Sequence, residues 1–270
     1  MSGPEADIDL ARCALLIAGQ FQPGLDIESG LSELDALAQQ AGGYPVQDAQ
    51  SLVEFMAGSS GFRGDSENYY SPVNSLLNRV LESRKGIPIT LAIVYICVTQ
   101  RLSTRSDGPS LRAFGVNFPG HFMVALTDLE SEHAVAPPLA DQDSADADDR
   151  HTDNRHHMPQ LIDPFAGKLV SRSECYDIIR KLYGREPDER DEYFAAASNK
   201  QILLRLLENL KAIYLQKKDF SNGLICLDYQ LLLYPNRETL LKQQQALLEH
   251  MRKQSKSNSH DGAAGNTHLH

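Results

Sequence analysis

Three short segments of the sequence place a hydroxyl, an imidazole and a carboxylate at the ends of predicted structural elements. The segments are Gly86-Ile87-Pro88-Ile89-Thr90-Leu91, Phe118-Pro119-Gly120-His121-Phe122 and Leu161-Ile162-Asp163-Pro164-Phe165. The first turn of a helix, where Thr90 is expected, has free backbone N–H groups that favour an anion. A histidine oriented by an aspartate beside a helix-borne hydroxyl is an arrangement that supports nucleophilic catalysis. Thr90, His121 and Asp163 are therefore the candidate catalytic residues.

Each of these residues also has a purely structural interpretation. The Thr90 hydroxyl can cap its own helix or bond to His121, and Asp163 can hold the turn at Pro164. A histidine near an apolar strand is often a core residue with one hydrogen-bond partner. Because a buried imidazole needs such a partner, we expect a hydrogen bond between His121 and Asp163.

Further polar and aromatic residues lie near these segments in the sequence. The residues expected to flank a cleft are Tyr69, Tyr70, Asn74 and Asn78, and those expected to line a pocket are Asn117 and Phe118. Helix packing and capping are the alternative for the first group.

The hydrophobic period predicts the elements that hold these residues. Apolar residues at helical spacing indicate helices over 8–18, 31–38 and 46–56, the second capped by Asp26 or Ser29. Ser71-Pro72 predicts a helix that starts with a hydroxyl cap and runs to Leu81. The next helix begins near Pro88 and is apolar on nearly every side, which is typical of a helix at the centre of a domain.

After this helix the apolar period changes to two. Strands are predicted over 111–118 and 121–126, joined by the Pro-Gly turn, with a short third strand over 160–163. A central helix followed by antiparallel strands indicates an α+β layer. Helical spacing returns after Ser198, and the order of helix, short turn, helix and proline has the shape of one tetratricopeptide unit.

Two segments lack an apolar pattern. The stretch between Thr127 and Pro159 is rich in Asp and His, and we expect an exposed, mobile insertion. It lacks the glycine and terminal glutamate of a calcium loop, so neither a metal nor a cofactor is expected. The polar tail from Ser255 is expected to be disordered.

Composition and charge exclude several classes of protein. The 270 residues carry a formal net charge of -10, a field that repels nucleic acid and anionic lipid. The four cysteines are scattered with no CxxC pair, which argues against a disulfide framework or a structural zinc site. No signal peptide is evident, and the longest apolar run, 87–98, is shorter than the roughly 20 residues that span a bilayer. We therefore expect a cytoplasmic protein without a membrane anchor, whose oligomeric state the sequence does not give.

The three segments, in this order, resemble the transglutaminase-like family known under the SirB name. The resemblance includes the lead-in Tyr70-Ser71-Pro72-Val73-Asn74-Ser75 and the stretch 203–214, and it covers most of residues 8 to 250. A related domain occurs in some F-box proteins of ubiquitin ligases. The resemblance implies a papain-like α+β core, with a central helix and a small antiparallel sheet, between an N-terminal helical segment and a C-terminal tetratricopeptide-like module. The expected boundaries are 1–60 for the helical segment, 61–190 for the core with an insertion over 128–158, 191–253 for the module and 254–270 for the tail.

The sequence departs from this family at the nucleophile. The family's enzymes use a Cys-His-Asp triad, and by position the resemblance implies that Thr90 replaces the cysteine while His121 and Asp163 match the other two members. Cys97 lies about two helical turns further along and is expected to be buried. A thiol ionises near pH 8.5 and more readily beside a positive charge, whereas a threonine hydroxyl does not ionise in this range.

The predicted function follows from this replacement. We expect a non-catalytic or weakly catalytic protein that acts by binding a protein or peptide, with a regulatory role suggested by the family's name alone. The alternative is a hydrolase or acyltransferase with a Thr90–His121–Asp163 triad. A third interpretation is that the motifs are signatures of the fold only.

Overall fold

A computed structural model describes residues 8–128, 159–184, 188 and 190–261 of the chain. The chain divides into two compact units, Met1–Leu203 and Leu204–His270. The first unit holds every strand found in the described residues, and also the candidate site. No helix in the part of the chain that the structure describes is both long enough and apolar enough to cross a membrane.

The first unit begins with helices, as the apolar spacing predicts. They are α1 (Leu10–Phe21), α2 (Ile27–Gly42) and α3 (Ala49–Val53), and α3 continues into the π-helical η1 (Glu54–Ser59). The Asp26 carboxylate caps α2 by accepting from the Glu28 backbone N–H at 3.0 Å, which confirms the first of the two predicted caps.

The third helix starts later than the apolar pattern indicates. We predict a helix from residue 46, but Asp48 caps the helix and fixes its first residue as Ala49. The Asp48 carboxylate accepts from the Ser51 N–H at 2.8 Å, and the Ser51 hydroxyl accepts from the Asp48 N–H at 3.1 Å. Such a reciprocal pair defines a helix N-terminus.

The predicted helix from Ser71 to Leu81 is wrong in its first half. The structure has a short 3₁₀ turn, η2 (Pro72–Ser75), and then a separate helix, α4 (Leu77–Ser83). The Ser71 side chain makes no capping bond. The Asn74 carbonyl accepts from the Ile87 N–H at 3.2 Å, so it is not part of a helical hydrogen-bond ladder and the two segments separate.

The helix α5 (Pro88–Ser103) and a five-stranded sheet form the centre of the first unit. The sheet is antiparallel throughout, in the order β6 (Lys168–Val170), β5 (Gln160–Asp163), β4 (Met123–Asp128), β3 (Leu111–Val116) and β7 (Ala196–Ala197). A small parallel pair, β1 (Arg63–Gly64) and β2 (Lys85–Gly86), precedes α5.

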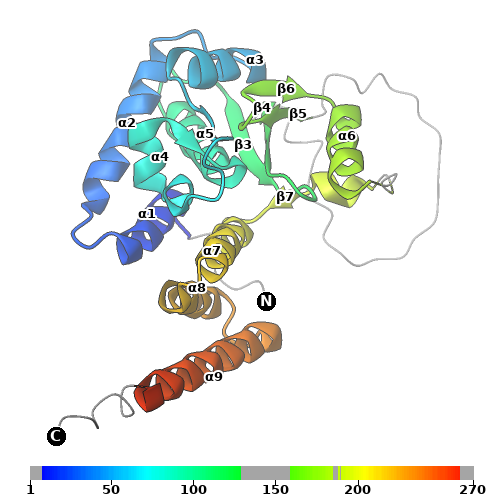
Figure 1. Cartoon of the computed structure of the whole chain (residues 1–270). Coiled ribbons are helices and arrows are strands. Elements are labelled where there is room, and N and C mark those ends of the chain that lie inside the picture. The colour runs from blue at the N-terminus through cyan, green and yellow to red at the C-terminus, as the bar shows by residue number, and fades with distance from the viewer. Residues whose placement is uncertain (1–7, 129–158, 185–187, 189, 262–270) are drawn as a thin grey trace, which may run out of the picture. The chain divides into compact units, whose positions relative to one another are not determined.

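Helices cover both faces of the sheet (Figure 1). The helix α5 packs on β3 and β4, and on its other sides it contacts α1, α2 and α4. The opposite face packs on α6 (Arg172–Tyr183) through Met123, Ala125 and Leu161. Because α5 is enclosed by the sheet and by three helices, its nearly all-apolar sequence is explained and its predicted central place is confirmed.

The strands differ from the prediction at one turn. β3 ends at Val116 and β4 begins at Met123, so His121 lies in the connecting turn and does not start a strand as predicted. Within the turn the His121 N–H donates to the Phe118 carbonyl at 3.1 Å, and Gly120 has a φ of 76°. This positive φ favours glycine and closes the turn tightly. The third predicted strand, 160–163, is confirmed as β5.

The apolar pattern does not predict α6, β6 or β7, nor the short pair β1 and β2. The Ser171 hydroxyl and the Glu174 carboxylate form a capping box at the start of α6, a signal that is readable in the sequence. β7 has two residues, which is too short for a periodic pattern.

The helix α7 (Asn199–Gln216) runs from the first unit into the second, which also contains α8 (Phe220–Leu233) and α9 (Glu238–Asp261). The expected disorder from Ser255 is wrong up to Asp261, because α9 continues to that residue. Neither proline nor glycine occurs between Arg237 and Asp261, so nothing breaks the helix before Gly262. The predicted insertion lies outside the described residues, except for Asp128 at the end of β4.

Candidate functional site

His121 and Asp163 form the predicted pair. The His121 Nε2 lies 2.9 Å from the Asp163 Oδ1, which is hydrogen-bond distance, and the expected bond between them is thus confirmed. The turn between β3 and β4 supplies the histidine, and the end of β5 supplies the aspartate. The side chains are 14% and 9% exposed, so the pair is partly shielded from water.

Asp163 also holds the turn that follows its strand. Its Oδ1 accepts from the backbone N–H groups of Phe165 at 2.9 Å and Ala166 at 3.0 Å. The structural role and the pairing with His121 therefore coexist on one oxygen atom. Burial raises the pKa of Asp163, but the bond from His121, the charge of that imidazole and the two amide bonds together lower it below the ordinary value of 3.8.

This lowered pKa predicts a pH dependence of stability. A carboxyl group with a depressed folded pKa stabilises the folded state above its unfolded pKa, and the contribution is lost as the pH falls through the folded value. The free energy of unfolding should therefore fall more between pH 5 and pH 2 in the wild type than in Asp163→Asn, which cannot titrate. Urea unfolding of both proteins across this range measures the difference. The other carboxylates titrate in both proteins, so their contributions cancel. Parallel curves would contradict the assignment.

Thr90 does not join the pair. It lies in the first turn of α5, as predicted, but Ile87 is the N-cap and the Thr90 side chain is completely buried. Among the described residues its Oγ1 has no hydrogen-bond partner, so it neither caps the helix nor bonds to His121. The structure brings two of the three candidate residues into contact and encloses the third.

An unpaired buried hydroxyl should destabilise the fold. Such a group loses its bonds to water and gains none in return, at a cost of about 1–3 kcal/mol. Thr90→Val, which replaces the hydroxyl by a methyl of similar shape, is therefore expected to raise the free energy of unfolding by about 1 kcal/mol. Chemical denaturation measures the change.

Thr99→Val is the matched control, since Thr99 is also completely buried on α5 with an unpaired Oγ1. Both variants should be stabilised alike. If Thr90→Val alone is destabilised, the Thr90 hydroxyl has a partner in solution and the description above is incorrect.

Two other reactive side chains of α5 are also enclosed. Cys97 is buried, as predicted, and burial raises the pKa of its thiol to about 12. At neutral pH that thiol stays protonated and is a poor nucleophile. The Tyr95 hydroxyl is buried without a partner among the described residues, and burial followed by the charge of Asp163 raises its pKa. Neither side chain replaces the missing thiolate.

An aromatic ring lies beside the His121 imidazole and begins a chain of ring contacts. The Phe165 ring stands edge-on to it with the centroids 6.4 Å apart, and the Tyr69 ring contacts Phe165 at 5.8 Å. Gly64 makes room for Phe165, because a Cβ at position 64 would lie 2.5 Å from the ring. Tyr70 stands against Tyr69 at 5.2 Å and is 64% exposed.

The end of α6 lies against the turn that carries His121. A Cβ added to Gly120 would lie 2.5 Å from Leu182 Cδ1 and 3.4 Å from the Tyr183 hydroxyl, so both side chains cover the turn that carries His121. Leu182 and Tyr183 are 56% and 54% exposed. We call the group Tyr69, Tyr70, His121, Leu182 and Tyr183 the His121 surface. The first three residues are candidates from the sequence, whereas Leu182 and Tyr183 are not, because α6 is not predicted.

The remaining predicted cleft residues are structural. The buried Asn74 donates to the Asp65 carboxylate at 3.1 Å, and Asn78 pairs with Gln22. Phe118 is completely buried in a cluster of aromatic rings, so the expectation that it lines a pocket is wrong. Its buried ring anchors the turn between β3 and β4 to the core. Asn117 is exposed at the start of that turn.

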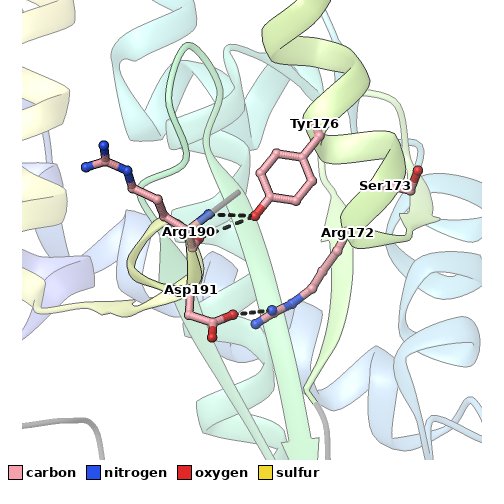
Figure 2. A pocket seen from close by; sticks show the side chains of 5 residues that line it. All are labelled: Arg172, Ser173, Tyr176, Arg190 and Asp191. Carbon is pink, nitrogen blue, oxygen red and sulfur yellow. Dashed lines mark hydrogen bonds and ion pairs between the residues drawn. The ribbon is translucent and has the colours of Figure 1, made fainter. Parts of the chain in front are cut away.

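A hollow of about 350 Å³ lies at the start of α6, lined by Arg172, Ser173, Tyr176, Arg190 and Asp191 (Figure 2). Arg172 is bound to Asp191 at 2.5 Å, and the Tyr176 hydroxyl accepts from the Arg190 N–H at 3.1 Å. Figure 2 shows the Arg190 guanidinium pointing away from Tyr176. These contacts fasten the segment that leads to β7. The described residues contain no cluster of three or more metal-ligating side chains.

Comparison with known proteins places this architecture. The chain is 29% identical over 246 residues to a UPF0162 protein of Xylella fastidiosa, covering 87% of the chain and 75% of that protein. It is 29% identical over 211 residues to the UPF0162 protein of Pseudomonas aeruginosa, covering 76% and 64%. Human F-box only protein 21 is 26% identical over 199 residues, which are 70% of the chain but 26% of that protein.

No solved structure matches the chain. The sequence profile of the transglutaminase-like superfamily matches residues 28–208, which include α5, the whole sheet and the His121–Asp163 pair. The matched region is more than half of the chain, and the chain therefore belongs to the transglutaminase-like superfamily.

Proposed function

We propose that this protein is a non-catalytic member of the transglutaminase-like superfamily that binds a peptide segment of a partner protein at the His121 surface. One observation carries the proposal. Thr90, the residue that the resemblance assigns to the nucleophile position, is completely buried and makes no hydrogen bond to His121. A nucleophile must touch its substrate and its base, and Thr90 reaches neither in this arrangement.

The exposed side chains around His121 support binding. Large apolar and aromatic side chains are enriched where proteins recognise one another, since each buries much area at little entropic cost. Tyr70, Leu182 and Tyr183 are each more than half exposed. Leu182 and Tyr183 lie against Gly120, next to His121, and Tyr70 is linked to the histidine through the rings of Tyr69 and Phe165. A peptide laid across them would cover the edge of the imidazole, and the pairing with Asp163 would fix the orientation of the ring.

We also propose that the C-terminal helices α7, α8 and α9 form a tetratricopeptide-like module. The order of α7, a short turn, α8, a proline turn and α9 supports it. We propose the same boundaries as the sequence predicts, 61–190 for the core and 191–253 for this module. We also propose a cytoplasmic location and kinship with the SirB proteins.

Affinity capture with the full chain tests the binding function. Extracts of the source cells are passed over the wild type, over Tyr70→Ser/Tyr183→Ser and over Leu232→Ser. Leu232 is 73% exposed in the second unit and serves as the matched control. Partners retained by the wild type and by Leu232→Ser should fall at least about tenfold with the double variant. Equal retention by all three proteins, or no specific partner for any of them, would count against the proposal.

The alternative function is a hydrolase or acyltransferase with Thr90, His121 and Asp163. One feature favours it: Asp163 binds the His121 Nε2, and the Nδ1 has no hydrogen-bond partner among the described residues, so it is available as a base. The hydrolysis rates of ester and amide substrates distinguish the two functions. We expect the wild type, His121→Ala and Thr90→Val to give the same rates. A rate lost in both variants would establish the enzyme.

A further inference from the structure

A groove in the second unit has an apolar lining and one cation. It has a volume of about 420 Å³ and lies between residues of α7, α8 and α9. Its apolar walls include Leu215, Phe220, Leu227 and Leu247, and its polar residues include Lys211 and His250. The His250 ring stands edge-on to Phe220 with the centroids 4.6 Å apart. All of these residues belong to the second unit, so the groove does not involve the His121 surface.

Lys211 is held in this groove without a counter-charge. Its Nζ donates to the Gln230 Oε1 at 2.9 Å and to the Gln243 Oε1 at 2.7 Å. Within the described residues no carboxylate lies at ion-pair distance from it, although the charge of Glu208 acts on it from the same helix. Burial lowers the pKa of Lys211, since the charged form is poorly solvated there.

The groups around Lys211 are short of hydrogen-bond acceptors. An ammonium group has three donors, and two of them have partners among the described residues. Gln230 is completely buried, and its Nε2 has no partner in the same part of the chain. Amide geometry puts this Nε2 within about 5 Å of the Lys211 Nζ, because the Oε1 of the same amide is 2.9 Å away. Buried donors without acceptors are unfavourable, and an anionic acceptor in the groove would satisfy the third donor of Lys211.

We propose that this groove binds a partner peptide that presents a carboxylate side chain between apolar side chains. The carboxylate accepts from the free donor of Lys211, while Gln230 and Gln243 hold the ammonium group in place. The apolar neighbours of the carboxylate pack on Leu215, Phe220 and Leu247. Charge complementarity sets the choice of an acid, since the groove offers a cation and none of the described carboxylates lies within ion-pair distance of it. The choice of a peptide follows from the apolar walls on three helices, which one side chain would not fill.

Selection from a random peptide library tests the proposal. Phage-displayed 12-residue peptides are selected on the full chain and counter-selected on Lys211→Met. The enriched peptides are then synthesised, and their affinities are measured by fluorescence anisotropy. Each should contain Asp or Glu flanked by Leu, Ile or Phe, and replacing that acid by its amide should weaken binding at least about tenfold. Lys242→Met is the control, since Lys242 is exposed and paired with Glu238 at 3.4 Å, and it should bind as the wild type does.

A second variant keeps the test valid if Lys211→Met fails to fold. Gln243→Glu is nearly isosteric and places a carboxylate where an amide oxygen now lies 2.7 Å from the Nζ. This internal acid should compete with the peptide and weaken its binding at least about tenfold, with the circular dichroism spectrum unchanged.

Several results would overturn the proposal. The selection could enrich no peptide, or it could enrich peptides that lack an acid. The enriched peptides could also bind Gln243→Glu with the same affinity as the wild type. Sodium decanoate provides a further arm, because it carries a carboxylate and an apolar chain but no peptide. If decanoate binds in a Lys211-dependent manner while no peptide is enriched, the occupant is a small carboxylic acid and the peptide assignment is wrong.

Discussion

Replacing Asp163 by alanine is expected to destabilise the protein by about 3–5 kcal/mol. The Asp163 Oδ1 accepts three hydrogen bonds, from the His121 ring and from the backbone N–H groups of Phe165 and Ala166. The side chain is 9% exposed, so water does not readily take its place. Alanine leaves three shielded donors without an acceptor and also releases the turn between β5 and β6. Urea unfolding followed by circular dichroism measures the loss.

Two conservative variants separate the roles of Asp163. Asp163→Asn keeps an oxygen of the same shape for the turn and loses only the charge, so about 1–2 kcal/mol should be lost. His121→Ala removes one of the three donors and leaves the turn intact, with an expected loss of about 1–3 kcal/mol. We thus expect Asp163→Ala to lose the most stability and the other two variants to lose much less. If Asp163→Ala stays within about 1 kcal/mol of the wild type, the carboxylate does not hold this site together.

The contact between His121 and Asp163 therefore also has a structural role. The His121–Asp163 bond joins the turn before β4 to the end of β5, two segments 42 residues apart in the chain. Its value to the fold does not depend on a nucleophile. A lineage that loses catalysis can retain the pair, because the bond and the turn remain useful to stability.

The sequence predicts the parts of this site that depend on local signals. The apolar run after Pro88 identifies α5 as the central helix, and the short strand predicted over 160–163 has the observed limits of β5. The His121–Asp163 bond follows from the need of a shielded imidazole for a partner. Each of these inferences uses residues that lie close together or a rule that holds in most folds.

The features that the sequence does not predict depend on tertiary contacts. The Asn74 carbonyl is bound to the Ile87 N–H, and no local pattern shows that this contact breaks the helix after Ser71. Likewise, the complete burial of Thr90 depends on the neighbours that enclose the start of α5. The exposed Leu182 and Tyr183 reach the turn that carries His121 only because α6 packs on the sheet, so this contact is not visible in the sequence.

The proposed function depends on the burial of Thr90, and the reactivity of a cysteine at this position, in Thr90→Cys, tests that burial directly. The substitution restores the thiol that the resemblance places at this position. A thiol at an open catalytic site beside a histidine is strongly activated, whereas a thiol in the core reacts only when the structure opens. Because Thr90 is completely buried, the introduced thiol should be protected from alkylation by a factor of at least about 100 relative to the unfolded chain.

The chain contains its own references for this experiment. Cys97 is buried on the same helix and should be equally protected, while Cys13 is partly exposed and should react sooner. Iodoacetamide labelling of Thr90→Cys is followed by peptide mass spectrometry, with and without 6 M guanidinium as the unfolding condition, and is repeated in the His121→Ala background. Here the added His121→Ala change tests whether the imidazole activates the thiol.

The rate of alkylation at position 90 in the folded protein is the most direct test of the account. We predict that the introduced thiol reacts as slowly as Cys97 and that His121→Ala leaves its rate unchanged. A thiol that reacts faster than Cys13, and slows when His121 is removed, would show an open and functional cleft and would contradict the proposal that this protein does not catalyse.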